Sequence, residues 1–460
     1  MGRVVLGGSA LVAVAMPVRA NGRFPAANQL VARPGDPSSM ILRATYGMLF
    51  SRDAGVTWHW VCERAIGYNG AEDPALGVFP DGRVTAGLFK GLAATTDQGC
   101  SWSFVKGGLE GQVVIDVAQW PGHPERGVAL TSTYAGEIAG TPRYKNEIFL
   151  TEDSGSTWNR IGSAIDPRAI SETIEVADSD PNRIYVSAIR GEDKKREGLV
   201  FVSTDGGAKF VERKVPIVLA DERAPFLAAV DPKNADRIYV RTSGPEKNRL
   251  LVSDDAGKKF RAVFTGGPLL GFSLTDGGET VYVGGSKDGL HVASTKDFAF
   301  TKRNTKAIEC LTSVGKTLYA CSNEANGFIL GRSDDQGTTF APLLHLGSMA
   351  GPLACPAGTS MNVCATDWAQ LKLEFNIEAS PGKGADGGVE GGLRAEDAGG
   401  APAPKKGARA CACDVVGARS SLPPGVPWLP LASIATWTSL AASRRFRRTR
   451  MRMRSEEGTP

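Results

Sequence analysis

Short apolar stretches, each followed by a polar turn, recur along residues 40–345. Typical stretches are residues 147–150, 199–202 and 250–252, which are rich in Leu, Val, Ile and Phe. A second apolar stretch precedes many of them, for example the sequence Arg-Ile-Tyr-Val at residues 183–186. Runs that are this short and rich in β-branched and aromatic residues predict strands rather than helices.

A turn motif follows these stretches at intervals of roughly 40 to 55 residues, a spacing typical of repeat architectures. The motif Ser-x-Asp-x-Gly-x-Thr-Trp is complete at residues 51–58, and again at residues 151–158 with Thr in the first position. A decayed copy without the glycine lies at residues 294–300, around Asp297. The aspartates of the six good copies are Asp53, Asp97, Asp153, Asp205, Asp255 and Asp335.

The chemistry of the motif predicts a hairpin turn. An aspartate can accept hydrogen bonds from backbone N–H groups a few residues further on and so close the turn. The glycine supplies positive φ without steric cost, and the terminal Trp or Phe buries a large ring against a neighbouring sheet. Each copy is therefore expected to join two antiparallel strands, one pair in every repeat.

The motif resembles the Asp-box, also called the bacterial neuraminidase repeat, and the resemblance covers about residues 23–345. In proteins that carry it, the box joins the third and fourth strands of a β-propeller blade. The resemblance implies an all-β fold, a seven-bladed β-propeller with four-stranded antiparallel blades. Six blades is the alternative if residues 294–300 do not belong to a blade. The box aspartates are then expected to hold turns on the face away from the functional channel.

The N-terminal residues 1–20 resemble a signal peptide. Arg3 precedes an apolar stretch at residues 4–18, and residues 18–20 offer a cleavage site of small residues. The alternative is a first core strand. We expect export, with the propeller occupying residues 21–375.

The C-terminal residues change in composition. Residues 376–410 are rich in Gly, Ala and Pro, which predicts a flexible linker. Residues 411–460 contain Cys411 and Cys413, a short apolar stretch, and a cluster of seven arginines at residues 444–454. This tail resembles the MYXO-CTERM sorting signal, which implies transient membrane contact, a myxosortase-like sorting protease, and a place at the cell surface, in the outer membrane or outside a Gram-negative bacterium. The apolar stretch is short and contains prolines, and a nucleic-acid-binding tail or a permanent anchor is the alternative.

The charge balance argues against a nucleic-acid partner. The whole chain has a net charge of +4. Removing both terminal segments leaves a net charge of about −3, because the excess arginines lie in those ends. The 42% hydrophobic content is enough for a large core.

Six cysteines remain outside the tail, and an even number in an exported chain predicts disulfides. Proximity in sequence favours Cys355 with Cys364 and Cys310 with Cys321, which leaves Cys62 and Cys100 near the outer strands of adjacent blades. Metal binding is the alternative, but the chain has only four histidines and no Cys-x-x-Cys.

The repeat alone does not identify an activity. The sequence nearest to a sialidase Phe/Tyr-Arg-Ile-Pro segment is Gly-Arg-Phe-Pro at residues 22–25, which has a different order. Another glycoside hydrolase would need two carboxylates facing each other. The candidates are Asp116, Glu175, Asp178 and Asp221, and the sequence does not pair them. Whether the protein is an enzyme stays open, with a non-enzyme favoured, and no catalytic, cofactor-binding or metal-binding residue is assigned.

The loops opposite the boxes are longest in repeats 3 to 5 and carry aromatic and charged residues. An aromatic and charged rim on a rigid scaffold predicts a recognition surface. We therefore expect a monomeric, non-catalytic binding module for a glycan or a surface protein. A secreted glycoside hydrolase on the same scaffold, sialidase-like or polysaccharide-degrading, is the alternative. The predicted rim consists of Tyr134, Arg143, Tyr144, Arg190, Lys194 and Arg249.

Overall fold

A computed structural model describes residues 24–70, 72–191, 195–219, 222–375 and 377. The chain divides into two units, residues 1–380 and 381–460, and the second lies outside the described residues. The predicted signal peptide, Cys411, Cys413 and the arginine-rich tail also lie outside them.

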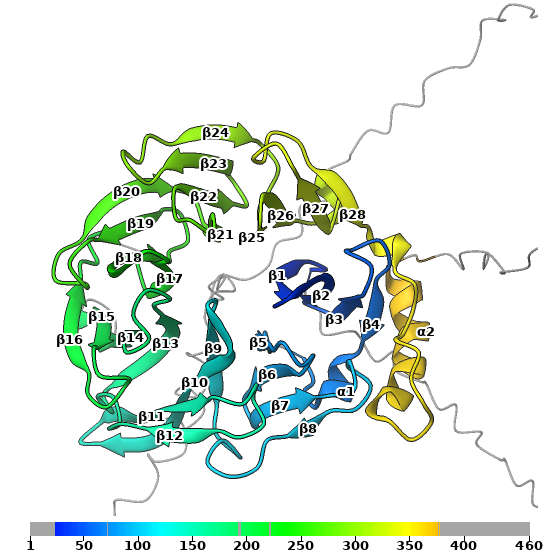
Figure 1. Cartoon of the computed structure of the whole chain (residues 1–460), viewed down its shortest axis with the longest axis horizontal. Helices are drawn as coiled ribbons and strands as arrows, with labels where there is room; N and C mark the ends of the chain where they lie inside the picture. Colours follow the sequence, from blue (N-terminus) through cyan, green and yellow to red (C-terminus); the bar gives the residue numbers. More distant parts are fainter. Residues whose placement is uncertain (1–23, 71, 192–194, 220–221, 376, 378–460) are drawn as a thin grey trace, which may run out of the picture. The chain divides into compact units, whose positions relative to one another are not determined.

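Seven four-stranded antiparallel sheets, the blades, surround a central axis (Figure 1). Each blade uses four strands that are consecutive in the sequence, and the first strand lies innermost. The predicted seven-bladed β-propeller is therefore confirmed. Blade 1 contains β1 (Ala27–Arg33), β2 (Asp36–Ala44), β3 (Gly47–Ser51) and β4 (His59–Val61); blade 2 contains β5 (Ala75–Val78), β6 (Val84–Leu88), β7 (Gly91–Thr95) and β8 (Ser103–Phe104); blade 3 contains β9 (Val114–Trp120), β10 (His123–Ile138), β11 (Thr141–Thr151) and β12 (Asn159–Ile161).

The remaining blades follow the same order. Blade 4 contains β13 (Ala169–Val176), β14 (Ile184–Arg190), β15 (Glu197–Ser203) and β16 (Val211–Val215); blade 5 contains β17 (Pro225–Asp231), β18 (Asn234–Thr242), β19 (Asn248–Ser253) and β20 (Arg261–Gly266); blade 6 contains β21 (Leu269–Leu274), β22 (Thr280–Gly285), β23 (Gly289–Ser294) and β24 (Thr301–Asn304); blade 7 contains β25 (Cys310–Val314), β26 (Thr317–Cys321), β27 (Leu330–Ser333) and β28 (Ala341–Leu344). The helices are α1 (Glu63–Ile66), η2 (Glu324–Asn326), η3 (Leu346–Ser348), η4 (Ser360–Val363) and α2 (Cys364–Glu374).

The core lies in the second and third strands of each blade. Every residue of β3, β7 and β19 is buried, whereas the fourth strands β12 and β24 are mostly exposed. The buried residues form apolar clusters between neighbouring sheets, as the continuous apolar sequence of the third strands predicts.

The predicted box turns have the expected geometry. In blade 1, the Ser51 hydroxyl donates to Asp53 Oδ1 over 2.8 Å, and Asp53 Oδ1 accepts the backbone N–H of Thr57 over 2.9 Å. The ring N–H of Trp58 donates to the carbonyl of Gly55 over 2.9 Å. The same Asp–backbone hydrogen bond recurs in the other five good copies. These aspartates are therefore used by their own turns.

Two successive residues of each good box have positive φ, as at the centre of a type I′ turn. In blade 1 they are Ala54 at 58° and Gly55 at 90°. The glycine has a second role, because it packs closely against the preceding blade. A Cβ at Gly207 would lie 2.7 Å from Ile161 of blade 3, and one at Gly337 would lie 2.1 Å from Leu290 of blade 6.

The decayed copy at residues 294–300 does join the third and fourth strands of a blade, β23 and β24. This turn is one residue shorter than the others, and Phe298 has positive φ of 54° where a good box has glycine. A cleft of about 260 Å³ lies between blades 5 and 6 beside this turn, lined in part by Thr295 and Lys296. The Phe298 ring is buried and packs against Tyr239 of blade 5, with centroids 6.3 Å apart, so this turn still contacts the preceding blade.

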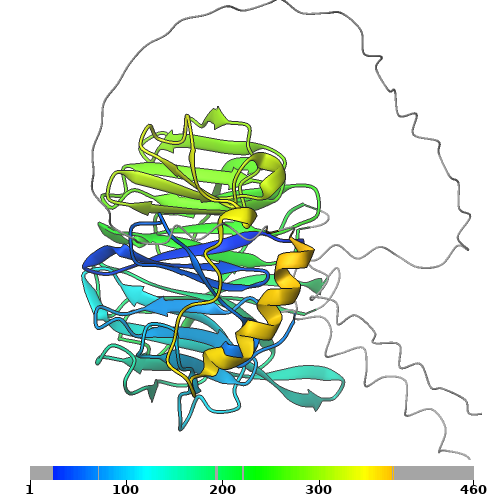
Figure 2. The ribbon, with the colours of Figure 1, turned by 90° about the vertical axis from the view of Figure 1, so that its right-hand side faces the viewer.

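The C-terminal end of the described chain crosses from blade 7 over the outer edge of blade 1. We call residues 345–375 the strap. The strap runs beside β4, where the backbone N–H of Trp60 donates to the carbonyl of Gly351 over 2.7 Å and that of Leu353 donates to the carbonyl of Trp60 over 2.9 Å. Figure 2 shows α2 lying across the outside of the propeller. Arg64 of α1 pairs with Asp367 of α2 at 2.6 Å.

Two disulfides fix the strap, Cys62–Cys364 and Cys100–Cys355, and a third joins Cys310 to Cys321 across a hairpin. The predicted Cys310–Cys321 pair is confirmed. The predicted Cys355–Cys364 pair is wrong, because these cysteines bond instead to Cys100 and Cys62, the two that the prediction left over. Proximity in sequence misled because the strap lies across blades 1 and 2, so each of its cysteines meets a different blade.

Candidate functional site

The longest hairpin of the propeller is formed by β10 and β11, on the face opposite the box turns. β10 has 16 residues, but its pairing with β9 ends at Thr131. Beyond that point β10 pairs only with β11, through Tyr134 opposite Tyr144 and Ile138 opposite Thr141. The end of the hairpin therefore extends past the rest of blade 3, and Figure 2 shows it projecting at the lower right.

Apolar side chains are exposed at the end of this hairpin. Ile138 is 62% exposed and Tyr134 is 43% exposed. The Tyr134 and Tyr144 rings meet edge to face, with centroids 6.1 Å apart. Arg143 lies beside them, and its guanidinium donates to the carbonyls of Thr141 and Pro142 at 3.4 and 3.2 Å. We call residues 134–144 the hairpin tip. Side chains that stay this exposed contribute little to folding, so the fold itself does not require an aliphatic or an aromatic residue here.

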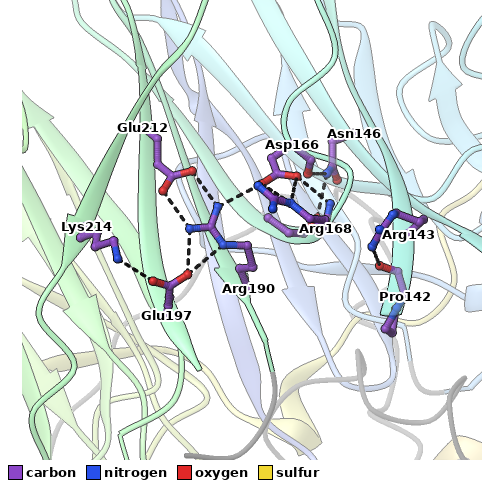
Figure 3. Close-up of polar contacts among 10 residues, drawn as sticks. Pro142, Arg143, Asn146, Asp166, Arg168, Arg190, Glu197, Glu212 and Lys214 are labelled. Atoms are coloured by element: carbon purple, nitrogen blue, oxygen red, sulfur yellow. Dashed lines mark hydrogen bonds and ion pairs between the residues drawn. The ribbon is translucent and has the colours of Figure 1, made fainter. Parts of the chain in front are cut away.

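Arg190 lies at the base of the neighbouring hairpin and is enclosed by carboxylates (Figure 3). Its guanidinium contacts Asp166 at 3.0 Å, Glu197 at 2.7 Å and Glu212 at 2.7 Å. The hydrogen bond with Glu212 is the largest cause of the raised pKa of Arg190. Burial opposes ionisation of Asp166, yet hydrogen bonds from Arg168 and Arg190 outweigh it and lower its pKa to about 2.

This network balances its own charges. Arg190, Arg168 and Lys214 face Asp166, Glu197 and Glu212, three cations against three carboxylates. The structure therefore uses Arg190 to tie β14 to β15, β16 and the loop before β13. Its donors are occupied, and it does not present a free charge to a ligand.

Arg249 does not belong to an exposed rim. Its side chain is only 9% exposed and forms a two-pronged pair with fully buried Glu222, at 2.6 and 2.8 Å. Burial would raise the pKa of Glu222, but hydrogen bonds from Arg249 and Thr242 outweigh it and lower the pKa. The prediction of Arg249 as a rim residue failed because its charged head is turned inward to this carboxylate. Lys194 lies outside the described residues.

Three half-buried carboxylates lie on inner strands of adjacent blades, Asp116 on β9 and Glu172 and Glu175 on β13. Asp116 accepts the backbone N–H groups of Val117 and Ile174, and so links blades 3 and 4. Burial raises the pKa of Asp116 to about 6 and that of Glu172 to about 8. Burial and then the charge of Asp116 raise the pKa of Glu175.

Glu172 was absent from the sequence candidates. It occupies a bulge in β13, where the register with β14 shifts between Ser171 and Thr173. A bulge redirects a side chain relative to simple alternation, so the strand pattern alone does not place it. Asp178 accepts the backbone N–H of Gly122 and acts as a turn contact, and Asp221 lies outside the described residues.

The described part of the chain also bears on metal sites, membrane spans and clefts. It contains no group of three or more His, Cys, Asp or Glu arranged to hold a metal ion. None of its helices is long and apolar enough to cross a membrane. The cleft between blades 5 and 6 carries ion pairs of its own, such as Lys233 with Glu279 at 2.6 Å.

The profile of the Sortilin-Vps10 family, described as sortilin, neurotensin receptor 3, matches residues 90–344. This range covers more than half of the chain, from the start of β7 to the end of β28. The chain belongs to the Sortilin-Vps10 family. No curated protein matches it.

Several solved structures resemble this family member at low identity. An ancestral GH74 enzyme is 14% identical with a TM-score of 0.49, and the match covers 70% of this chain and 49% of that one. Hydrazine synthase of Kuenenia stuttgartiensis is 13% identical with a TM-score of 0.47, over 70% of this chain and 98% of that one. A GH74 xyloglucanase from Xanthomonas campestris is 14% identical with a TM-score of 0.35, over 72% and 66%. The chain spans about half the length of the ancestral GH74 enzyme, and similarities at this level do not choose among these activities.

Proposed function

We propose that this protein is a non-catalytic binding module that engages a protein or glycan at a cell surface through the hairpin tip. The observation that carries the proposal is the extension of β10 and β11 beyond their blade, with Ile138 and Tyr134 exposed at its end. The ring of blades does not need this extension, because the pairing of β10 with β9 ends earlier. The family description, which names a receptor, supports a binding role.

Export and surface sorting belong to the same proposal. Three disulfides are compatible with an oxidising compartment. The resemblance of the N-terminal and C-terminal sequences to targeting signals supports this part of the proposal. Intact-mass analysis of surface material tests this part, with both ends expected to be missing. Full-length protein recovered from the cytoplasm would contradict it.

The binding test compares two surface variants of the mature protein. Ile138→Ser combined with Tyr134→Ala removes the exposed apolar groups of the tip. Val56→Ser is the matched control, because Val56 is 79% exposed in a box turn on the opposite face. Binding to intact cells and to a polysaccharide panel should weaken at least tenfold in the tip variant, the size expected for a contact residue worth more than about 1.4 kcal/mol. Equal binding by both variants would refute the proposal.

A glycoside hydrolase remains the second candidate, favoured by one observation. Asp116 and Glu172 lie on inner strands of adjacent blades, and burial raises their pKa values unequally, to about 6 and about 8, as a pair of ionised carboxylate and general acid requires. Hydrolysis of a polysaccharide that is lost in Glu172→Gln, but kept in the tip variant, would favour the enzyme.

A further inference from the structure

We infer that the partner of the hairpin tip is a protein with an apolar pocket bordered by a carboxylate, and this inference rests on the proposed binding function. Its first support is the shape of the tip. Ile138 and Ala139 stand at the turn, with Tyr134 on one side, and all three are exposed. An aliphatic side chain at the end of a narrow two-stranded ribbon is suited to insertion into a pocket.

The edges of the ribbon disfavour recognition by strand addition. Pro142 in β11 has no N–H to give to an added strand. In β10 the register shifts between Tyr134 and Glu137, which leaves Ala135 and Gly136 unpaired with β11. Bulges and prolines are the features that keep exposed edges from pairing with another chain. The side chains of the tip, rather than its backbone, must therefore provide the contacts.

The tip carries one cation, Arg143, and one carboxylate, Glu137, which hydrogen-bonds to Tyr134. The hydrogen-bonding capacity of Arg143 sets the second feature of the partner. Among the described residues, the guanidinium of Arg143 has only the carbonyls of Thr141 and Pro142 as partners. The nearby cations Lys145 and Arg160 already have a carboxylate partner, since both pair with Glu147, at 2.9 and 2.8 Å. A carboxylate on the partner would complete the hydrogen bonding of Arg143, since a guanidinium binds a carboxylate through two parallel N–H groups.

The residue types of the tip favour a protein over a glycan. Tyr and Arg are the side chains most enriched among the contacts that dominate protein interfaces. Tyr134 could also stack on a sugar, but Ile138 and Ala139 have no group that bonds to sugar hydroxyls. Ile138 and Ala139, at the very end of the tip, would contribute to binding only if they are buried against an apolar surface of the partner.

The test places a photo-crosslinking amino acid at position 138, with position 56 as the control, in the protein expressed from the whole coding sequence and displayed on the cells that produce it. A protein adduct is expected from position 138 and not from position 56. The adduct should fall at least tenfold when Arg143→Glu is added, and Arg143→Lys should restore most of it. Mass spectrometry then identifies the partner, whose crosslinked peptide should border an apolar pocket.

The outcomes separate this inference from the proposed function. A glycan adduct at position 138, or a protein adduct that is unaffected by Arg143→Glu, would overturn the stated partner while leaving binding by the tip intact. Equal adducts from positions 138 and 56, or no adduct together with unchanged cell binding by Ile138→Ser, would overturn both.

Discussion

The two disulfides of the strap offer the sharpest test of how this propeller closes. Blade 1 is built entirely from the first four strands, so no strand from the C-terminal end completes it. Closure depends instead on contacts between β1 and β25, such as the Thr312 hydroxyl donating to the carbonyl of Leu30 over 3.0 Å, and on the strap. Replacing Cys62 and Cys364 by Ala, or Cys100 and Cys355 by Ala, removes one cross-link at a time.

The magnitude follows from the loop that each cross-link closes. The separations are 302 and 255 residues, which alone would predict about 5.5 kcal/mol for either disulfide. With one disulfide in place, however, the other closes a loop of only roughly 47 residues, because the path runs through the first cross-link. Losing one disulfide should therefore cost about 4 kcal/mol, and losing both about 9.5 kcal/mol, which is about 1.5 kcal/mol more than the two single losses added together.

Urea unfolding followed by circular dichroism measures these free energies, and limited proteolysis of residues 345–375 reports release of the strap. Removing Cys310–Cys321, which spans 11 residues within blade 7, is the control. That loss should add almost independently to the loss of either strap disulfide, because a bypass of 11 residues hardly shortens loops of 302 and 255 residues. Simple additivity between the two strap disulfides, or an intact strap in the variant lacking both, would refute this account of ring closure.

Three further predictions concern single residues. Arg249→Met should lower the free energy of unfolding by about 3–5 kcal/mol because it leaves the Glu222 carboxylate buried without its cation; a loss below about 1 kcal/mol in urea titration would show that the pair is dispensable. Burial raises the pKa of Glu172 to about 8 in the folded state, so the folded protein favours the neutral carboxyl and loses stability as the pH rises from about 4.5 to 8. Glu172→Gln should therefore raise the free energy of unfolding by up to about 3 kcal/mol at pH 7 and by almost nothing at pH 4.5. An effect of Glu172→Gln that does not change with pH would contradict this cause. Gly207→Ala should cost about 1–3 kcal/mol more than Gly206→Ala in thermal unfolding, because both have positive φ but the new Cβ would lie 2.7 Å from the preceding blade at the first and 3.6 Å from the nearest atom at the second; equal losses would show that the close approach is unimportant.

The architecture was predictable from the sequence because the box turn is a local structure. The hydrogen bonds of the turn all form within eight residues, among Ser51, Asp53, Gly55 and Trp58. The spacing of these residues in the sequence is therefore enough to predict the turn. Even the decayed copy around Asp297 could be placed, since a strand–turn–strand pattern survives the loss of glycine. The strand positions followed from the same repeat.

The predictions that failed concern residues whose surroundings are set by distant parts of the chain or by an irregular strand. Cys355 and Cys364 are neighbours in sequence, yet the path of the strap carries them to different blades. Arg249 was predicted to be exposed because its sequence neighbourhood is a charged loop, but it pairs with buried Glu222, which lies 27 residues earlier in the chain. Glu172 was missed because a bulge breaks the alternation of β13; a second glutamate inside one strand was the only signal available.

The most direct test of the central claim removes the hairpin tip while keeping the blade. Thr133 lies opposite Lys145 in the register of β10 and β11, so a two-residue Asn-Gly turn can join them. The shortened protein should fold with nearly unchanged circular dichroism and midpoint of unfolding, because the tip contributes little to the core. Its binding to the cells that the intact protein recognises should be lost. Undiminished binding by the folded, shortened protein would show that recognition lies elsewhere on the propeller.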